Sequence, residues 1–285
     1  MCRFLAYQGP EITVHDLLYA PEHSLIKQSY QAHESDRPLN ADGFGLGWYS
    51  PDITPEPARF VSVTPAWNNM NLKSLASHIR TPVVLAHVRR ASIGGVAENN
   101  CHPFHYKNML MMHNGYVDDF IQIKRSLTNK LSDERYAWVN GQTDSQHLFA
   151  LFLDHYLNGE ARGANAMAAA FVTLFQDLAT LKQQAGLNSP SFLNMVITDG
   201  QEMVATRYVD MPDATPLSLH HAHGSHYRCD EHGRTMLAVS NQEHSANLIA
   251  SEPLSSQAEH WEVVPANHFV LIDTNGYSKF VAIKV

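Results

Sequence analysis

The order of the predicted secondary-structure elements limits the fold more than any other feature of this sequence. Strand-like segments dominate the first part of the chain, helical patterns fill residues 143–185, and only strand-like segments follow Pro190. A block of helices between two blocks of strands is typical of stacked layers in an α+β fold, and not of alternating βαβ units. No internal repeat or linker divides the sequence, so we expect residues 1–285 to form a single domain.

The individual elements are predicted from apolar periodicity and from helix and turn signals. The predicted helices cover residues 15–19, 24–31, 70–79, 118–127, 143–156 and 161–185. The predicted strands cover residues 1–7, 40–49, 82–88, 108–112, 192–198, 203–208, 216–221, 235–240, 262–264, 268–272 and 279–285. Three alternating glycines in residues 40–49 leave one strand face bare, which suits close approach of either another backbone or a ligand.

Composition excludes several classes of protein. Of the 285 residues, 44% are hydrophobic and 17% charged, which is enough apolar material for a substantial core. The net charge of −8, with His neutral, argues against a nucleic-acid surface. No apolar run approaches the ~20 residues that span a bilayer, and residues 1–20 lack the features of a signal peptide, so we expect a cytoplasmic protein without membrane contact. Three cysteines without a CxxC pair argue against a disulfide framework or a zinc ribbon, and we expect neither a metal nor a cofactor.

Cys2 is the residue that most strongly suggests a catalytic function. The initiator Met can be removed when a small side chain follows, and Cys2 would then carry a thiol and a free α-amine on one residue. An α-amine has a pKa of about 7.7–8, so it can act as a base for the thiol of the same residue. The strand predicted directly after Cys2 would hold this end of the chain in a core. The alternative is an ordinary cysteine behind a retained Met1.

Four further short motifs lie at the ends of predicted elements, where functional side chains usually gather. They are His87-Val88-Arg89, Asn100-Cys101-His102-Pro103, His113-Asn114-Gly115 and Thr143-Asp144. Together with Cys2, this ordered set resembles the class II glutamine amidotransferases, which are N-terminal nucleophile hydrolases. The opening Met-Cys-Arg-Phe-Leu-Ala-Tyr, residues 40–49 and Ser251-Glu252-Pro253-Leu254 make the chain most similar to the stand-alone subgroup, with the ergothioneine-pathway γ-glutamyl hydrolase and the fungal glutathione-degradation amidotransferase subunit.

The resemblance implies a four-layer α/β/β/α sandwich, in which two antiparallel sheets pack between helices. It also implies hydrolysis of a γ-glutamyl amide, in glutamine or in a γ-glutamyl conjugate or peptide. Cys2 would form a thioester with its α-amine as the base, and the Asn114 side-chain amide and the Gly115 backbone N–H would hold the oxyanion.

The same resemblance implies the residues that bind the glutamate head group. Arg89 would bind the α-carboxylate, a task for which a bidentate guanidinium is suited. Asp144 would accept from the α-ammonium, and His102 would line the pocket nearby. The chain departs from larger family members at Arg90, where Trp is frequent, and in the loop of residues 92–99.

Each of these positions also has a purely structural alternative. Arg89 and Arg90 could form a solvated pair, although alternation turns one of them inward. Asp144 could cap a helix, with Thr143 as the rival cap, and Asn114-Gly115 could be a type I′ hairpin turn. We expect His87 and His113 to be buried, hydrogen-bonded supports, and Cys101 to be a small buried residue.

The histidine-rich segment (residues 220–232) is a rival site. His221 and His223 could chelate a metal from one strand face, with His226 or Cys229 completing the site, but the spacing fits no zinc pattern and a polar loop is the preferred interpretation. Two other functions stay open beside the hydrolase. One is a glutaminase subunit that passes ammonia or glutamate to a separate partner, and the other is a catalytically silent binding module that retains Met1. The sequence leaves open whether the chain binds a partner subunit or forms a homo-oligomer.

Overall fold

Two antiparallel sheets form the centre of the molecule. The computed structural model describes residues 2–34, 38–238, 245–256 and 261–285. Within them, the first sheet has the order β13 (Glu262–Val263), β9 (His220–Gly224), β12 (Ala246–Ala250), β1 (Arg3–Thr13), β4 (Arg80–Val88), β2 (Phe44–Ser50) and β3 (Thr54–Ser62). The second has the order β15 (Ser278–Ala282), β14 (His268–Ile272), β8 (Met203–Val209), β7 (Phe192–Thr198), β6 (Met109–Tyr116) and β5 (Phe104–Tyr106). A separate hairpin joins β10 (His226–Cys229) and β11 (Thr235–Ala238).

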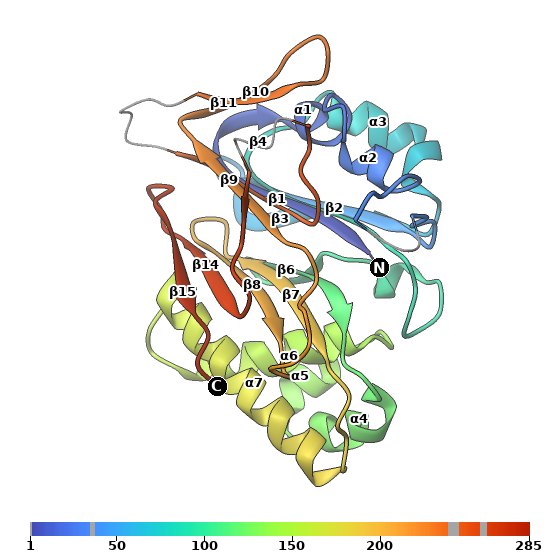
Figure 1. Cartoon of the computed structure of the whole chain (residues 1–285), viewed down its shortest axis with the longest axis vertical. Coiled ribbons are helices and arrows are strands. Elements are labelled where there is room, and N and C mark those ends of the chain that lie inside the picture. Colours follow the sequence, from blue (N-terminus) through green and yellow to red (C-terminus); the bar gives the residue numbers. More distant parts are fainter. Residues whose placement is uncertain (1, 35–37, 239–244, 257–260) are drawn as a thin grey trace.

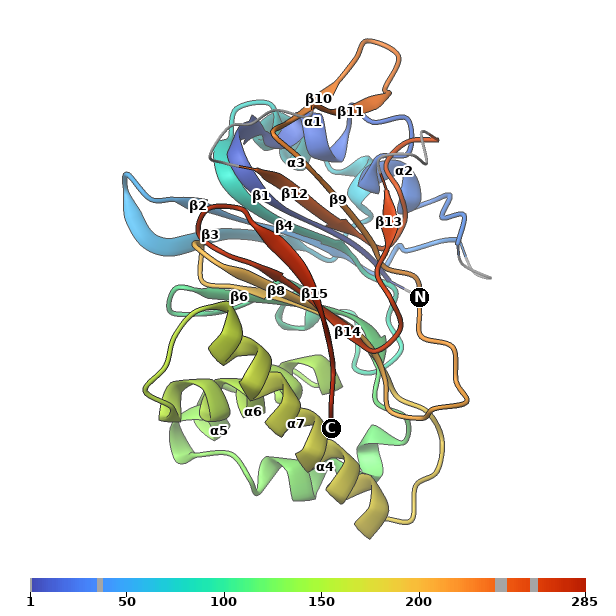
Figure 2. The same ribbon diagram turned by 60° about the vertical axis from the view of Figure 1, so that its left-hand side comes forward.

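Helices cover the outer face of each sheet, as Figures 1 and 2 show. The first sheet carries α1 (Val14–Leu18), α2 (Leu25–Gln28) and α3 (Met70–Ala76). The second carries α4 (Phe120–Thr128), α5 (Asp133–Trp138), α6 (Asp144–Asn158) and α7 (Ala164–Gln184). Two single turns of 3₁₀-helix, η1 (Ala66–Asn68) and η2 (Glu98–Asn100), lie in connections. The predicted four-layer α/β/β/α sandwich is therefore confirmed.

Alternation along β1 shows how the sequence builds these layers. Phe4 and Ala6 belong to the core between the two sheets, whereas Leu5 and Tyr7 belong to the core under α1–α3. Successive side chains of a strand point to opposite faces, so a strand buried on both faces is apolar throughout. A third core fills the space between the second sheet and α4–α7.

Helix α7 belongs to this third core. It is the one described helix that is long and apolar enough to cross a membrane by length and composition alone. In this fold its Met167, Phe171, Leu174 and Leu178 are buried at helical spacing against the second sheet.

The bare glycine face of residues 40–49 accommodates another part of the backbone. A Cβ added at Gly45 would lie 2.0 Å from the carbonyl oxygen of His102, and one at Gly47 would lie 2.8 Å from the Pro103 ring. Of the two interpretations of this stretch, the structure supports close strand packing.

Most predicted elements are present, with boundaries shifted by a few residues. Strands 192–198 and 268–272 are confirmed at both ends, whereas β3, β5, α5, β10 and β12 were not predicted. The bounds of the strand predicted at 216–221 are wrong, because β9 begins only at His220 and continues to Gly224. The strand predicted at 235–240 is present as β11, and its last two residues lie outside the described residues.

The polar loop predicted for the histidine-rich segment is wrong, because this segment forms β9 and β10. His220 and His221 are buried between β12 and β13, and the Nε2 atom of His221 lies 3.0 Å from Oδ1 of Asn247. His221 and His223 stack on one face, as alternation predicts, with ring centroids 5.5 Å apart. Among the described residues, no group of three His, Cys, Asp or Glu side chains is arranged to hold a metal.

Candidate active site

The start of β1 and the end of β4 bring Cys2 beside the two arginines. Arg3 pairs with Val88 in the sheet register, so Cys2 lies opposite the residues that follow β4. The backbone N–H of Arg90 donates to Cys2 Sγ at 3.2 Å, and the thiol donates to the carbonyl oxygen of Arg90 at 3.3 Å. The half-buried thiol is therefore held by the backbone of one residue at a strand end.

The environment of this thiol acts on its pKa in two directions. Burial raises the pKa of Cys2, and the backbone N–H of Arg90 and the cations of Arg89 and Arg3 oppose that rise. Burial dominates, so the resting thiol is neutral. A neutral thiol needs a base before it can act as a nucleophile.

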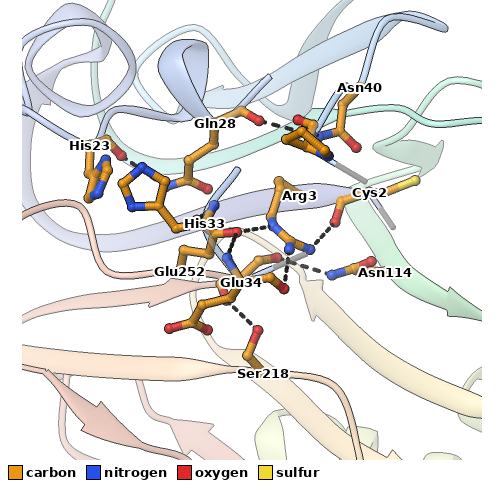
Figure 3. Close-up of polar contacts among 12 residues, drawn as sticks. Cys2, Arg3, His23, Gln28, His33, Glu34, Asn40, Asn114, Ser218 and Glu252 are labelled. Carbon is orange, nitrogen blue, oxygen red and sulfur yellow. Dashed lines mark hydrogen bonds and ion pairs between the residues drawn. The ribbon is translucent and has the colours of Figure 1, made fainter. Parts of the chain in front are cut away.

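Asn114 and Gly115 belong to the second sheet and lie near the strand ends that carry Cys2 and Arg89. Both lie within β6 and pair with β7, so the predicted alternative of a hairpin turn is wrong. Asn114 is 1% exposed, and its Nδ2 donates to the Ser251 hydroxyl at 3.3 Å. That hydroxyl also accepts from the backbone N–H of Phe4 at 3.1 Å, so one oxygen atom separates Asn114 from the strand that carries Cys2. Figure 3 shows Cys2 and Asn114 on neighbouring segments.

Only glycine fits at position 115. A Cβ built there would lie 1.8 Å from the carbonyl oxygen of Phe192 and 2.6 Å from Nε2 of His113. The backbone φ of +157° also lies in a region that other residues rarely adopt. The close pairing of β6 with β7 therefore determines this residue independently of any chemistry.

Arg89 is the arginine that alternation turns inward. It is 2% exposed, whereas Arg90 is half-buried. The Arg89 guanidinium donates from Nη1 to Gly95 O at 3.1 Å and from Nη2 to Ile93 O at 3.2 Å. Arg89 is therefore buried, and the alternative in which Arg89 and Arg90 form a solvated pair is wrong.

The loop around Arg89 is anchored to the segment that precedes α6. Asn100 donates to the carbonyl oxygen of Gly95 at 2.9 Å and accepts from the backbone N–H of Gln142 at 2.9 Å. The Gln142 side chain in turn accepts from the backbone N–H of Gly95 at 3.2 Å. These contacts place the loop of residues 93–100 close to the start of α6.

Asp144 is the first residue of α6, and Thr143 is the cap. The Thr143 hydroxyl accepts from the Gln146 N–H at 3.2 Å, which confirms the rival cap. The buried Asp144 carboxylate accepts from the backbone N–H of Val117 at 2.8 Å and from that of Ser145 at 2.8 Å. It thereby joins the end of β6 to the start of α6.

A pocket of about 360 Å³ lies between the loop that follows Arg89 and the segment that follows Gly115. Its lining residues are Ser92, Ile93 and residues 116–121, so it contacts both the Arg89 loop and the segment held by Asp144. A larger pocket of about 490 Å³ lies at the other end of β1, beside Gln8 and Gly200. The smaller pocket lies next to the residues that follow Arg89 and Gly115 in sequence, although none of the predicted site residues lines it.

Three buried histidines lie behind the site. His87 and His113 make the hydrogen bonds expected of supports: His87 Nε2 is 3.3 Å from His113 O, and His113 Nδ1 is 2.9 Å from the Ser145 hydroxyl. The His102 ring packs between His87 and Phe104, with centroid distances of 4.3 and 4.5 Å. Burial lowers the pKa of His87 to about 3, and burial holds the pKa of His102 well below its ordinary range.

The structure thus gives His102 a packing position, and neither of its ring nitrogens has a partner among the described residues. Its predicted contact with the substrate head group stays a prediction. Cys101 is fully buried, as expected, and burial raises the pKa of its thiol to about 11.

Three residues beside Cys2 received no role from the sequence, namely Arg3, Ser251 and Glu252. All three are 2% exposed or less. Arg3 and Glu252 form a buried ion pair 2.5 Å long, which Figure 3 shows next to Cys2. The available signal was their position: Arg3 follows Cys2, and the Ser251-Glu252 motif occurs among the residues that carry the family resemblance.

Comparison with known proteins identifies the class to which this fold and this group of residues correspond. The chain belongs to the class II glutamine amidotransferases, because residues 21–281 match the family described as "Glutamine amidotransferases class-II". The family match and the mycobacterial relative described next support hydrolysis of a γ-glutamyl amide bond as its reaction.

The relatives support the predicted stand-alone subgroup. The chain is 35% identical over 291 residues to the "Probable glutamine amidotransferase DUG3" of Saccharomyces cerevisiae, covering 95% of this chain and 82% of the relative. It is 29% identical over 212 residues to the "Gamma-glutamyl-hercynylcysteine sulfoxide hydrolase" of Mycolicibacterium smegmatis, covering 74% of this chain and 80% of that relative.

Solved structures agree with the fold. A glutamine aminotransferase class-II domain protein from Silicibacter pomeroyi superposes over the full length of both chains, with a TM-score of 0.66 and 25% identity. The glutamine phosphoribosylpyrophosphate amidotransferase of B. subtilis matches all of this chain and 50% of its own, with a TM-score of 0.61 and 15% identity. The second similarity concerns the fold alone.

Proposed function

We propose that this chain hydrolyses a small γ-glutamyl substrate with Cys2 as the nucleophile, after removal of Met1 has freed the α-amine of Cys2. One observation carries the proposal: the Cys2 thiol lies at the strand ends where Arg89 follows β4, and the Ser251 hydroxyl connects the same strand, β1, to Asn114. Strands from two sheets converge there, and the residues that follow Arg89 and Gly115 line a pocket large enough for a small molecule.

The first half of the reaction forms a thioester. The α-amine takes the proton from the Cys2 thiol, and sulfur attacks the γ-carbonyl carbon of the substrate. The carbonyl oxygen becomes an oxyanion that accepts from Asn114 Nδ2 and the Gly115 N–H, and each such donor is worth about 3 kcal/mol of barrier. The C–N bond then breaks, and the leaving nitrogen takes the proton from the α-ammonium. This base is needed because the thiolate, and not the neutral thiol, is the nucleophile.

The second half repeats these steps with water as the nucleophile. The α-amine takes a proton from water, and the resulting hydroxide attacks the thioester carbonyl. The C–S bond breaks, glutamate leaves, and the thiol recovers its proton. The same oxyanion donors serve both halves, so no metal or organic cofactor has a step in this mechanism.

The head group is bound by the two charged residues beside the pocket. Arg89 has five N–H donors, and its backbone contacts leave donors free for an α-carboxylate. Asp144 accepts from two backbone N–H groups and from the Ser145 hydroxyl, and its Oδ2 atom keeps a lone pair for an α-ammonium. His102, whose ring packs against His87, would line the pocket near the head group.

The names of the relatives support a choice of substrates. The yeast relative is named as a glutamine amidotransferase and the mycobacterial relative as a hydrolase of a γ-glutamyl conjugate. We therefore propose glutamine or a γ-glutamyl conjugate or peptide as the substrate of a cytoplasmic enzyme. A partner subunit or self-association stays a prediction.

The test measures glutamate release from glutamine, glutathione, a γ-glutamyl anilide and a γ-glutamyl amine. Intact mass first establishes that Met1 is absent from the preparation. Cys2→Ala should abolish release from every substrate, because the variant has no nucleophile, whereas Cys101→Ala should retain it as the matched control. Mass spectrometry of acid-quenched reactions should find a glutamyl adduct on the peptide that begins with Cys2.

Each other result has a clear meaning. Turnover by Cys2→Ala at the wild-type rate would refute the proposed mechanism. Retained Met1 together with no release would favour the silent binding module. Release that appears only after a co-purifying protein is added would favour the glutaminase subunit.

A further inference from the structure

The two residues after β12, Ser251 and Glu252, have no part in the chemistry proposed above. Both are buried, with exposures of 0% and 2%, and both are polar. A buried carboxylate and a buried hydroxyl are retained only when they have partners, because desolvation of an unpaired polar group is unfavourable. The partners of Ser251 and Glu252 lead to the two halves of the active site.

Glu252 is connected to Cys2 through Arg3. Its carboxylate accepts from Arg3 Nε at 2.5 Å and from the backbone N–H groups of His33 and Glu34 at 2.8 and 2.9 Å. The other two nitrogens of Arg3 donate to Cys2 O at 2.8 Å and to Glu34 O at 2.6 Å. Figure 3 shows the Arg3 guanidinium with these three partners around it. The peptide group between Cys2 and Arg3 is thereby held by the Arg3 guanidinium, and Glu252 fixes the orientation of that guanidinium.

Ser251 is connected to Asn114 directly. Its hydroxyl oxygen accepts from Asn114 Nδ2 at 3.3 Å and from the Phe4 N–H at 3.1 Å. Its backbone N–H donates to Phe4 O at 3.1 Å, and its carbonyl oxygen accepts from the Ser218 hydroxyl at 2.9 Å. One hydroxyl therefore sets the separation between the strand of the nucleophile and the amide of the oxyanion site, across the gap between the two sheets.

We propose that Ser251 and Glu252 are positioning residues for this reaction, Glu252 acting through Arg3 on Cys2 and Ser251 acting through Asn114 on the oxyanion site. The inference rests on the proposed function for the roles of Cys2 and Asn114. Nucleophilic attack requires the reacting atoms to be about 3–3.5 Å apart, and a displacement of 1 Å costs about 100-fold in rate. Two adjacent residues thus adjust the nucleophile and the oxyanion donors to the same carbonyl group.

The first experiment replaces Glu252 by Gln. An amide keeps the size of the side chain, but it loses the charge that pairs with Arg3, and its NH₂ group opposes the N–H groups of the loop. We expect kcat for γ-glutamyl hydrolysis to fall about 100-fold while KM changes less than about threefold, because head-group binding is untouched. Glu252→Asp keeps the charge and should recover part of kcat.

The matched control for Glu252→Gln is Asp154→Asn. Asp154 is a buried carboxylate paired with Arg135 and bonded to Ser132 in the helical layer, without contact to the active site. Its loss should lower the melting temperature and leave kcat of the folded fraction unchanged. If Asp154→Asn and Glu252→Gln lower kcat equally at equal folded fraction, the role of Glu252 is only structural and the proposal is overturned.

The second experiment tests Ser251 through non-additivity and does not depend on the folding of Glu252→Gln. Ser251→Ala, Asn114→Ala and the double variant are compared by kcat and KM. If Ser251 acts through Asn114, the double variant should be no slower than Asn114→Ala alone. A loss equal to the product of the two single losses would overturn the proposal for Ser251.

The two proposals fail in different ways. If Cys2→Ala retains turnover, the proposed function itself is wrong. If Cys2→Ala is inactive and both Glu252→Gln and Ser251→Ala keep the wild-type kcat, the function stands and the positioning roles are wrong.

Discussion

The buried side chain of His87 makes the stability of the folded protein depend on pH. It lies on β4, two residues before Arg89, and its ring is 1% exposed. Burial lowers the pKa of His87 from the ordinary 6.5 to about 3, so the unfolded chain takes up a proton at pH values where the folded chain does not. The contribution of the neutral ring to stability is therefore complete above pH 6.5 and is lost progressively as the pH falls toward 3.

The magnitude follows from linkage. At pH 5 the ring is almost fully protonated in the unfolded chain and neutral in the folded protein. Lowering the pH from 7 to 5 should then reduce the free energy of unfolding by about 2 kcal/mol through His87 alone. His221, whose pKa burial lowers to about 4, adds a second contribution of the same sign in the first sheet.

The assay is urea unfolding followed by tryptophan fluorescence at pH 7 and pH 5, on the wild type and on His87→Gln. A glutamine amide can replace the ring nitrogen that lies 3.3 Å from His113 O, and it does not titrate. The free energy lost between the two pH values should be about 2 kcal/mol smaller in His87→Gln than in the wild type. Exposed His78→Gln controls for the replacement of a histidine as such. Equal losses in the wild type and His87→Gln would refute the argument.

The remaining predictions concern the substrate site and the pairing of β6 with β7. Arg89→Lys should raise KM for γ-glutamyl substrates about 10- to 100-fold and change kcat less, because a point charge cannot reproduce a bidentate contact; Arg90→Lys is the control, and equal effects on KM in steady-state assays would contradict the assignment. Gly115→Ala should lower the melting temperature by more than about 5 °C or prevent folding, because its Cβ would lie 1.8 Å from Phe192 O. Gly186→Ala, with φ of +69° and no atom within 4 Å of the added Cβ, measures the cost of the backbone conformation alone. A smaller effect at Gly115 than at Gly186, by differential scanning fluorimetry, would argue against the steric account.

Local chemistry explains which parts of the fold were predictable. Strands 192–198 and 268–272 are apolar runs that are buried on both faces, and their limits follow from composition. Strand β3 contains two prolines and lies at the edge of its sheet, so its own residues carry little strand signal. The histidine-rich segment is polar in sequence, and its strands form through pairing with other parts of the chain: β9 pairs with β12 and β13, and β10 pairs with β11.

The site shows the same division. Cys2, Arg89, Asn114 and Asp144 could be selected because each lies near an end of a predicted element and belongs to a motif that carries the family resemblance. Alternation predicted that either Arg89 or Arg90 points inward, the family motif selected Arg89, and its burial is confirmed. The position of His102 did not follow, because its ring packs against His87 and Phe104 from other strands.

The sequence by itself determined the order of strands and helices and the family, because these depend on residue type and on spacing along the chain, and the family resemblance in turn implied the layers and the proposed site residues. Only the tertiary structure decided how those residues are held. Glu252 lies 249 residues from Arg3 in sequence and 2.5 Å from it in space, and Ser251 lies 137 residues from Asn114 and 3.3 Å from it. Contacts at such separations leave no periodicity in the sequence, since they exist only after β12 has paired with β1 and the two sheets have packed.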